Sequence, residues 1–299
     1  MLDQKYITFY ARSRKVRADV AERDVVLTYV LRILLEDVLP KMAFKGGTCL
    51  KKIYFGDIGR FSMDLDFTSC GMELEELKKS LEQLLGNKTK YGIDFDVVEE
   101  NVRASPSGDM ESYVAVVRYS HSWNTGEFLL EVSYREQPVL PLQKQLLLDE
   151  MYFKYSEFPR FAIICLQKEE LLAEKLRAAL QRIRSQDLYD LYLFSSRPFD
   201  KDLVKRLVVV KCWNVREPFN SEKLLDRVEN ADYDWNDLQQ LVRRGDLPSQ
   251  QFVTRTVLKE YLFLKDLDNQ LQRIARDSKA HKESRFVEKF IDALRDGYR

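Results

Sequence analysis

The 299-residue chain has only two histidines, His121 and His281, and four cysteines without metal-ligand spacing. A histidine-ligated metal and a Ser-His-Asp triad are therefore poor candidates. The scattered cysteines indicate neither a disulfide framework nor a zinc site. The first residues contain no signal-peptide run, and no segment approaches the ~20 apolar residues of a membrane span. We expect a cytoplasmic protein with no membrane partner.

An excess of charge of either sign is also missing, since 48 Lys and Arg balance 48 Asp and Glu. A protein that is basic as a whole is excluded, but nucleic-acid binding depends on where the charges lie. Residues 12–17 and 273–285 are locally basic. Each stretch is ordinarily a solvated helix face, and each becomes a set of phosphate contacts if the substrate is RNA.

A Gly-Gly-hydroxyl turn precedes two closely spaced carboxylates. Gly46 and Gly47 lack a Cβ, so successive backbone N–H groups can approach an anion, and Thr48 adds a hydroxyl donor. Asp64 and Asp66 are spaced i, i+2, which on a strand places both on one face. Such oxygen ligands suit Mg²⁺. The alternatives are a surface turn and a solvated strand face, but the combination predicts a site for a nucleoside triphosphate and its metals.

Two more side chains are candidates for this site. Ser62 precedes Asp64 by two residues, so the same strand would place it beside the metals; the alternative is a hydroxyl hydrogen-bonded at a strand start. Glu131 is the sole charge in an apolar predicted strand, where an unpaired buried carboxylate is costly and a metal would remove that cost. A half-exposed strand with Glu131 facing solvent explains the pattern equally well.

A predicted helix over residues 167–184 carries another candidate, Lys175. Its neighbour Leu176 belongs to the apolar face, so Lys175 can reach inward, where a cation would neutralise a triphosphate. The alternative is an ion pair with Glu170. Further on, Asp187 could cap the next helix, whereas Asp190, one turn later, is harder to explain as a cap.

The periodicity of apolar residues predicts an α+β fold with a small mixed sheet flanked by helices. We place a first domain at residues 1–150 and a mostly helical domain at residues 151–299. A turn signal occupies residues 105–109. The predicted helices before the second domain are residues 22–39, 48–54 and 74–85, and the predicted strands are residues 43–45, 63–68, 93–102, 112–120 and 127–134.

The two blocks Lys45–Thr48 and Arg60–Phe67 resemble the first motif of the AbiEii/AbiGii-type nucleotidyltransferase toxins, a family within the DNA polymerase β-like nucleotidyltransferase superfamily. A second block, Leu171–Leu176 followed by Arg184 and Asp187–Leu191, resembles that family's Glu-Lys-Leu and Arg-x-x-Asp-x-Tyr-Asp-Leu signature. The resemblance covers roughly the span 20–195. Gln186 departs from it, because the family often carries a basic residue there.

The resemblance implies an enzyme that transfers NMP from an NTP to an RNA acceptor such as the tRNA 3′ end. Its helical domain would complete the active site. It also implies the toxin of a toxin–antitoxin or phage-defence system, with a cognate antitoxin as partner. Nucleotide transfer to a protein and non-catalytic NTP binding are the alternatives.

The same resemblance implies roles for individual residues. Asp64 and Asp66, with Glu131 as a third carboxylate, would hold Mg²⁺ or Mn²⁺. Asp190 would orient Lys175 or contact the nucleotide. The triphosphate would be held by Gly46, Gly47, Thr48, Ser62 and Lys175.

Overall fold

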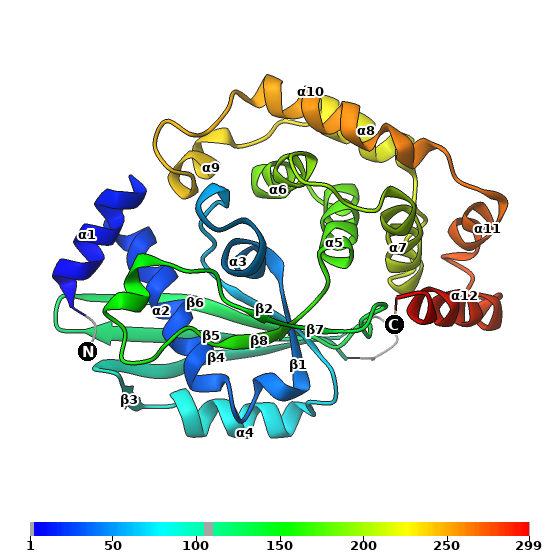
Figure 1. The fold of residues 1–299 in the computed structure, drawn as a ribbon. Coiled ribbons are helices and arrows are strands. Elements are labelled where there is room, and N and C mark those ends of the chain that lie inside the picture. The colour runs from blue at the N-terminus through cyan, green and yellow to red at the C-terminus, as the bar shows by residue number, and fades with distance from the viewer. Residues whose placement is uncertain (1–2, 105–109, 299) are drawn as a thin grey trace. The chain divides into compact units, whose positions relative to one another are not determined.

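The computed structural model describes residues 3–104 and 110–298 (Figure 1). The turn predicted at residues 105–109 lies outside the described residues. Contacts along the chain define two compact units. The first unit contains Met1–Gln137, Leu142–Cys165 and Gln240–Gly245, and the second contains Pro138–Pro141, Leu166–Gln239 and Asp246–Arg299.

A mixed eight-stranded sheet, in the order β3-β4-β5-β6-β2-β1-β8-β7, forms the centre of the first unit. β2 runs parallel to β6 and β1 runs parallel to β8, whereas the other neighbours are antiparallel. The predicted mixed α+β class is confirmed. The strands are β1 Met42–Lys45, β2 Leu65–Ser69, β3 Lys88–Lys90, β4 Ile93–Ala104, β5 Met110–His121, β6 Asn124–Ser133, β7 Gln143–Leu146 and β8 Ala162–Cys165.

Helices cover the sheet of the first unit, and Figure 1 shows α3 and α4 on opposite sides of it. In α4, Leu77, Leu81 and Leu85 are spaced by four residues and are buried, which is the apolar stripe of a helix packed on a sheet. The helices are α1 Gln4–Arg14, α2 Ala18–Leu34, α3 Gly46–Cys49 and α4 Leu74–Leu85, with single turns at Leu39–Lys41, Leu50–Phe55, Gly56–Ile58 and Met151–Lys154.

The prediction of α4 is confirmed, but other boundaries in this unit were wrong. The helix predicted at 22–39 ends at Leu34, and Pro40 lies in a separate 3₁₀ turn. The helix predicted at 48–54 begins two residues earlier, at Gly46, and continues as a π-helical turn. Strands β7 and β8 were missed because each has four residues, too few for a period-2 pattern to stand out.

Helices make up most of the second unit. α5 was predicted to reach residue 184 but ends at Gln181, because Arg182 adopts an extended backbone. Within the described residues, no helix combines the length and apolar character that a membrane crossing needs. The helices are α5 Lys168–Gln181, α6 Ser185–Ser195, α7 Lys201–Asn214, α8 Ser221–Asn230, α9 Trp235–Leu241, α10 Gln250–Glu260, α11 Asn269–Asp277 and α12 Ser284–Asp296, with a 3₁₀ turn at Tyr261–Lys265. The last two residues of α9, Gln240 and Leu241, belong to the first unit.

Candidate functional site

The turn that joins β1 to α3 lies directly against β2, the strand that carries Asp66. Gly46 has a φ of 76°, a backbone conformation that favours glycine. A Cβ atom added to it would lie 2.0 Å from the Oδ2 atom of Asp66. Glycine is therefore required at position 46 for two reasons: the turn needs a positive φ, and the Asp66 carboxylate leaves no space for a Cβ atom. The fold brings the Gly-Gly motif and the Asp-x-Asp motif to one place.

Gly47 lies equally close to the segment that enters β2. A Cβ on this residue would be 2.7 Å from a terminal nitrogen of Arg60 and 2.9 Å from the Oγ atom of Ser62. The structure thus places Ser62 beside the turn. Arg60 was not predicted as a site residue, although its position at the start of the Arg-Phe-Ser block was a usable signal. Its guanidinium puts a cation beside the backbone that would face phosphate.

Thr48 holds the turn against the strand. Its Oγ1 atom donates a 2.5 Å hydrogen bond to the carbonyl oxygen of Asp64, and its side chain is buried. This bond fixes α3 relative to the start of β2. Donation by Thr48 to a phosphate stays a prediction.

Two of the three predicted metal ligands, Asp66 and Glu131, lie on the neighbouring strands β2 and β6, whereas Asp64 directly precedes β2, outside the strand that was predicted to include it. Asp66 is the register partner of Glu131 on β6 and of Lys45 on β1. Register partners on adjacent strands share one face of a sheet, so these three side chains form a row with Asp66 in the middle. The Oδ1 atom of Asp64 accepts a 3.0 Å hydrogen bond from the backbone N–H of Leu129. Asp64, Asp66 and Glu131 are all half-buried.

This donor set has the chemistry that Mg²⁺ prefers, since hard cations take carboxylate oxygens. Like charges on adjacent strands repel each other, and a cation would relieve the repulsion between Asp66 and Glu131. Across the part of the chain that the structure describes, however, no three His, Cys, Asp or Glu side chains converge on a point that could hold a metal. Metal binding at these residues stays a prediction.

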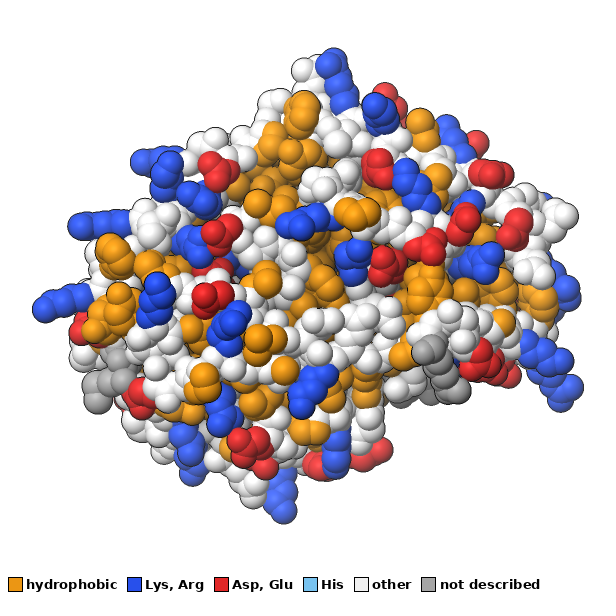
Figure 2. All heavy atoms as spheres, viewed as in Figure 1, with side chains coloured by type: hydrophobic (Ala, Val, Ile, Leu, Met, Phe, Trp, Pro, Cys, Tyr) orange, Lys and Arg blue, Asp and Glu red, His pale blue; other side chains and the backbone are white. Residues whose placement is uncertain are grey.

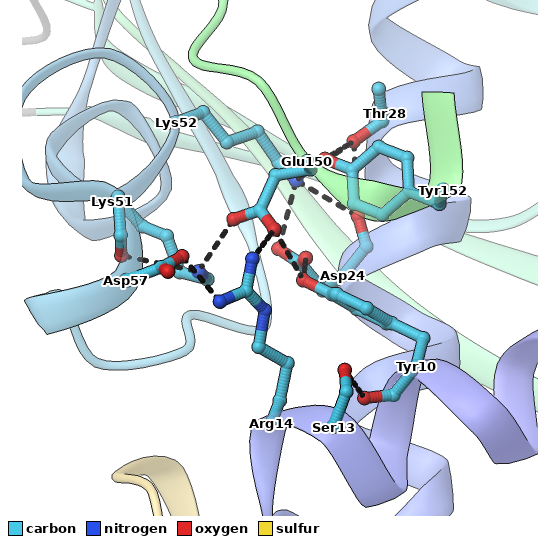
Figure 3. A network of polar contacts seen from close by, with 11 residues as sticks. Tyr10, Ser13, Arg14, Asp24, Thr28, Lys51, Lys52, Asp57, Glu150 and Tyr152 are labelled. Atoms are coloured by element: carbon cyan, nitrogen blue, oxygen red, sulfur yellow. Dashed lines mark hydrogen bonds and ion pairs between the residues drawn. The ribbon is translucent and has the colours of Figure 1, made fainter. Parts of the chain in front are cut away.

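A buried charge network lies beside the π-helical turn that continues α3 (Figure 3). We define it by Arg14, Asp24, Lys51, Lys52 and Glu150. The ammonium group of Lys52 lies 2.8 Å from Asp24 Oδ1. It also donates to the Asp24 carbonyl oxygen at 2.9 Å and to the Oγ1 atom of Thr28 on α2 at 2.8 Å. Buried charges are tolerated when they are paired and hydrogen-bonded in this way.

The rest of this network joins α1 to the same turn. Arg14 on α1 forms an ion pair with Glu150, and Lys51 contacts Glu150 at 3.2 Å (Figure 3). Tyr10 donates a 2.8 Å hydrogen bond to Asp24. Burial raises the pKa of Asp24, but Lys52 and Lys51 lower it more, so this carboxyl has a pKa below its usual value. The network was not predicted from the sequence, because its five charges come from four separate segments.

Lys175 and Asp190 meet each other in the second unit. The ammonium group of Lys175 on α5 lies 2.8 Å from Asp190 and 3.0 Å from Asp187, both on α6. The alternative that Asp187 caps α6 was wrong, because its carboxylate binds Lys175 and Arg182. Burial raises the pKa of Asp187, but Lys175 and Arg182 lower it more, so the pKa falls below its usual value.

Glu170, which the alternative explanation paired with Lys175, has other partners. Glu170 contacts Lys211 on α7 at 2.7 Å and accepts hydrogen bonds from the N–H groups of Val139 and Leu140. The structure therefore shows the pairing of Asp190 with Lys175. Contact of either residue with nucleotide stays a prediction.

Known proteins show what this arrangement resembles. The family model described as "Nucleotidyl transferase AbiEii toxin, Type IV TA system" matches residues 30–273. The solved structure of MenT4, a nucleotidyltransferase toxin from Mycobacterium tuberculosis, is 28% identical, and the match covers 99% of this chain and 100% of MenT4 with a TM-score of 0.82.

Two chains from Helicobacter pylori also match in structure. One is JHP933, which is 17% identical over 93% of this chain and 99% of its own with a TM-score of 0.48. The other carries the description "putative nucleotidyltransferase" and is 17% identical over 92% of this chain and 99% of its own with a TM-score of 0.49. No curated protein sequence matches the chain. The family match spans most of the sequence, and the chain belongs to the AbiEii family of nucleotidyltransferase toxins of type IV toxin–antitoxin systems.

Proposed function

We propose that the chain uses Mg²⁺ to transfer NMP from an NTP to the 3′-hydroxyl of an RNA acceptor such as tRNA. The observation that supports this best is the close fit of Gly46 against Asp66, which puts a phosphate-binding turn next to a carboxylate. In the reaction, the acceptor oxygen forms a bond to the α-phosphorus. The bond from that phosphorus to the leaving oxygen breaks, pyrophosphate departs, and the hydroxyl proton goes to solvent.

The first unit supplies most of the proposed chemistry. The backbone N–H groups of Gly46 and Gly47 would bind phosphate oxygens, and Arg60 and Ser62 would add donors beside them. Asp64, Asp66 and Glu131 would hold Mg²⁺, or Mn²⁺ in its place. The bound metal supplies positive charge to the triphosphate and lowers the pKa of the acceptor hydroxyl.

The second unit would contribute Lys175. Asp190 and Asp187 hold its ammonium group, which keeps it charged and oriented. In the proposal this cation binds the triphosphate and then the departing pyrophosphate. The mostly helical part of the chain would thus complete the active site.

Family membership supports two further parts of the proposal. A type IV toxin implies a cognate antitoxin. In the proposal, the toxin and its antitoxin act in growth control or phage defence. The proposed reaction would take place in the cytoplasm, where NTP and tRNA are both present.

The test is an incorporation assay with the purified chain, Mg²⁺, total tRNA and each α-labelled NTP in turn, with the Asp66→Ala variant as control. We expect labelled tRNA with the wild type and none with the variant. Label on protein alone would replace the RNA acceptor with a protein. Binding of NTP without any labelled product would identify a non-catalytic binder and end the proposal.

A further inference from the structure

The end of α1 carries exposed basic side chains that the proposed reaction does not use. Arg12, Lys15 and Arg17 are exposed, whereas Arg14 between them turns inward to Glu150. Arg14 therefore has a buried partner, whereas the charges of Arg12, Lys15 and Arg17 face water.

A distant segment of the same unit adds to this surface. The backbone N–H of Arg244 donates a 3.1 Å hydrogen bond to the carbonyl oxygen of Lys15, and Arg17 donates a 3.3 Å hydrogen bond to the side chain of Gln240. Arg244 is exposed as well. We call Arg12, Lys15, Arg17 and Arg244 the basic cluster. These hydrogen bonds bring basic residues from two distant parts of the sequence to one surface.

Within the described residues, Arg12, Lys15 and Arg244 form no ion pair. Arg17 forms an ion pair with Asp19 at 2.8 Å, but both side chains are more than half exposed, and such surface pairs are weak. Elsewhere the signs alternate, as the mixed red and blue side chains of Figure 2 show for the face in view. The second basic stretch is of this mixed kind, since Arg273 pairs with Glu283. The basic cluster is therefore a local positive region on a protein of zero net charge.

Exposed aromatic rings accompany these charges on α1. Phe9 is 55% exposed and precedes Arg12 by three residues, which places both on the same side of the helix. Tyr6, also exposed, stacks on Tyr155 with ring centroids 4.1 Å apart. Basic side chains follow a phosphate backbone, and exposed rings stack on unpaired bases, so the combination is typical of single-stranded nucleic-acid binding.

The basic cluster is connected to the candidate active site. The carbonyl oxygen of Leu241 accepts a 2.7 Å hydrogen bond from the backbone N–H of Phe61. Phe61 lies between Arg60 and Ser62, the two residues that contact Gly47. The segment that carries Arg244 is therefore tied to the segment that would hold the triphosphate.

From these contacts we infer that the basic cluster and Phe9 bind the acceptor RNA near its reacting 3′ end. The inference rests on the proposed function and adds the surface that would recognise the acceptor. The phosphates of the last nucleotides would contact the four basic side chains, and an unpaired base would stack on Phe9. Because α1 is anchored by Arg14 and Tyr10, RNA binding would not have to order it.

The test uses the full chain and measures tRNA affinity by fluorescence anisotropy across a salt series from about 50 to about 200 mM. The variant is Arg12→Gln/Lys15→Gln/Arg244→Gln. We expect its salt-dependence slope to fall by about 2–3, since each lost phosphate contact removes about 0.7–0.9. We expect the KM for tRNA to rise about tenfold or more, with kcat and NTP affinity unchanged. Phe9→Ala should weaken tRNA binding by about fivefold or more.

The matched control is Lys79→Gln/Lys88→Gln/Lys90→Gln, which removes the same charge from exposed positions on and near β3. It should leave the slope and the KM for tRNA as in the wild type. Equal tRNA affinity and equal salt-dependence slope in the two triple variants would overturn the inference. The proposed function would still stand in that case if the wild type labels tRNA in the incorporation assay.

The two proposals can fail separately. A wild type that binds tRNA with the expected cluster dependence but transfers no nucleotide would refute the proposed function and retain the binding surface. A wild type without measurable tRNA affinity would overturn both.

Discussion

The first unit holds charge in two different settings. In the buried charge network, each carboxylate faces a cation, as with Asp24 and Lys52 at 2.8 Å, and little of either side chain reaches water. At the candidate metal site, Asp66 and Glu131 are half-buried neighbours of like charge. Paired burial supports the fold, whereas neighbouring carboxylates repel each other, and Lys45 on the other side of Asp66 offsets part of that repulsion. The network thus pairs opposite charges, whereas the candidate metal site brings two like charges together.

The carboxylates should give the largest effect on activity. Asp66→Asn should lower the rate of nucleotide transfer by about 10³-fold, because losing a metal ligand costs about 4 kcal/mol of transition-state stabilisation. Without metal, its free energy of unfolding should stay within about 1 kcal/mol of the wild type, because the substitution removes both the repulsion from Glu131 and the attraction to Lys45. Transfer kinetics and chemical denaturation measure the two quantities. Glu99→Gln, which neutralises an exposed carboxylate on β4, is the control; a stability loss above about 1 kcal/mol for Asp66→Asn would contradict the comparison.

The buried charge network should give the largest effect on stability. Lys52→Met should lower the free energy of unfolding by about 3–5 kcal/mol, because it leaves Asp24 charged and unpaired in the interior. Urea denaturation measures the loss. The double variant Asp24→Leu/Lys52→Met should recover much of it, as both charges are then gone. No recovery would mean that the other hydrogen bonds of this pair matter more than its charges.

A comparison of two glycine variants can distinguish the effect of backbone strain from the effect of a contact with Asp66. Gly46→Ala and Gly71→Ala each place an alanine at a positive φ, which should cost about 1–2 kcal/mol of stability. A Cβ at Gly71 meets nothing within 4 Å, whereas one at Gly46 meets Asp66. We therefore expect both variants to lose stability but only Gly46→Ala to lose most transfer activity. Equal activities would show that the turn does not need to approach the carboxylate.

The smallest effect concerns acid stability in the second unit. Asp187 has a lowered pKa, so its ion pairs stabilise the folded state above the unfolded Asp pKa of about 3.9 and lose that effect as the pH falls below it. Arg182→Gln should lower the free energy of unfolding by about 0.5–1 kcal/mol at pH 7, since Arg182 is half exposed. The difference from the wild type should vanish on acidification. A difference that grows below about pH 4 would refute the assignment.

The sequence predicted those parts of the molecule that depend on local pattern. Leu77, Leu81 and Leu85 identified α4, and the Gly-Gly turn with Asp64 and Asp66 identified the site that the fold assembles. The buried charge network could not be predicted, because pairing depends on which segments meet in space. Thr48 shows the same limit: a hydroxyl that suits a phosphate by type in fact donates to the backbone at Asp64. The metal and nucleotide roles remain predictions.

The hydrogen bond from Phe61 to Leu241 has a consequence for synthesis on the ribosome. Residues 60–62 emerge long before residue 241, and at about 5–20 residues per second the delay is roughly ten seconds or more. Until then, the strand entrance beside Gly47 lacks its backbone partner. The segment around Gly47 is therefore complete only after residue 241 has been synthesised, so residues 1–240 alone would lack this backbone contact.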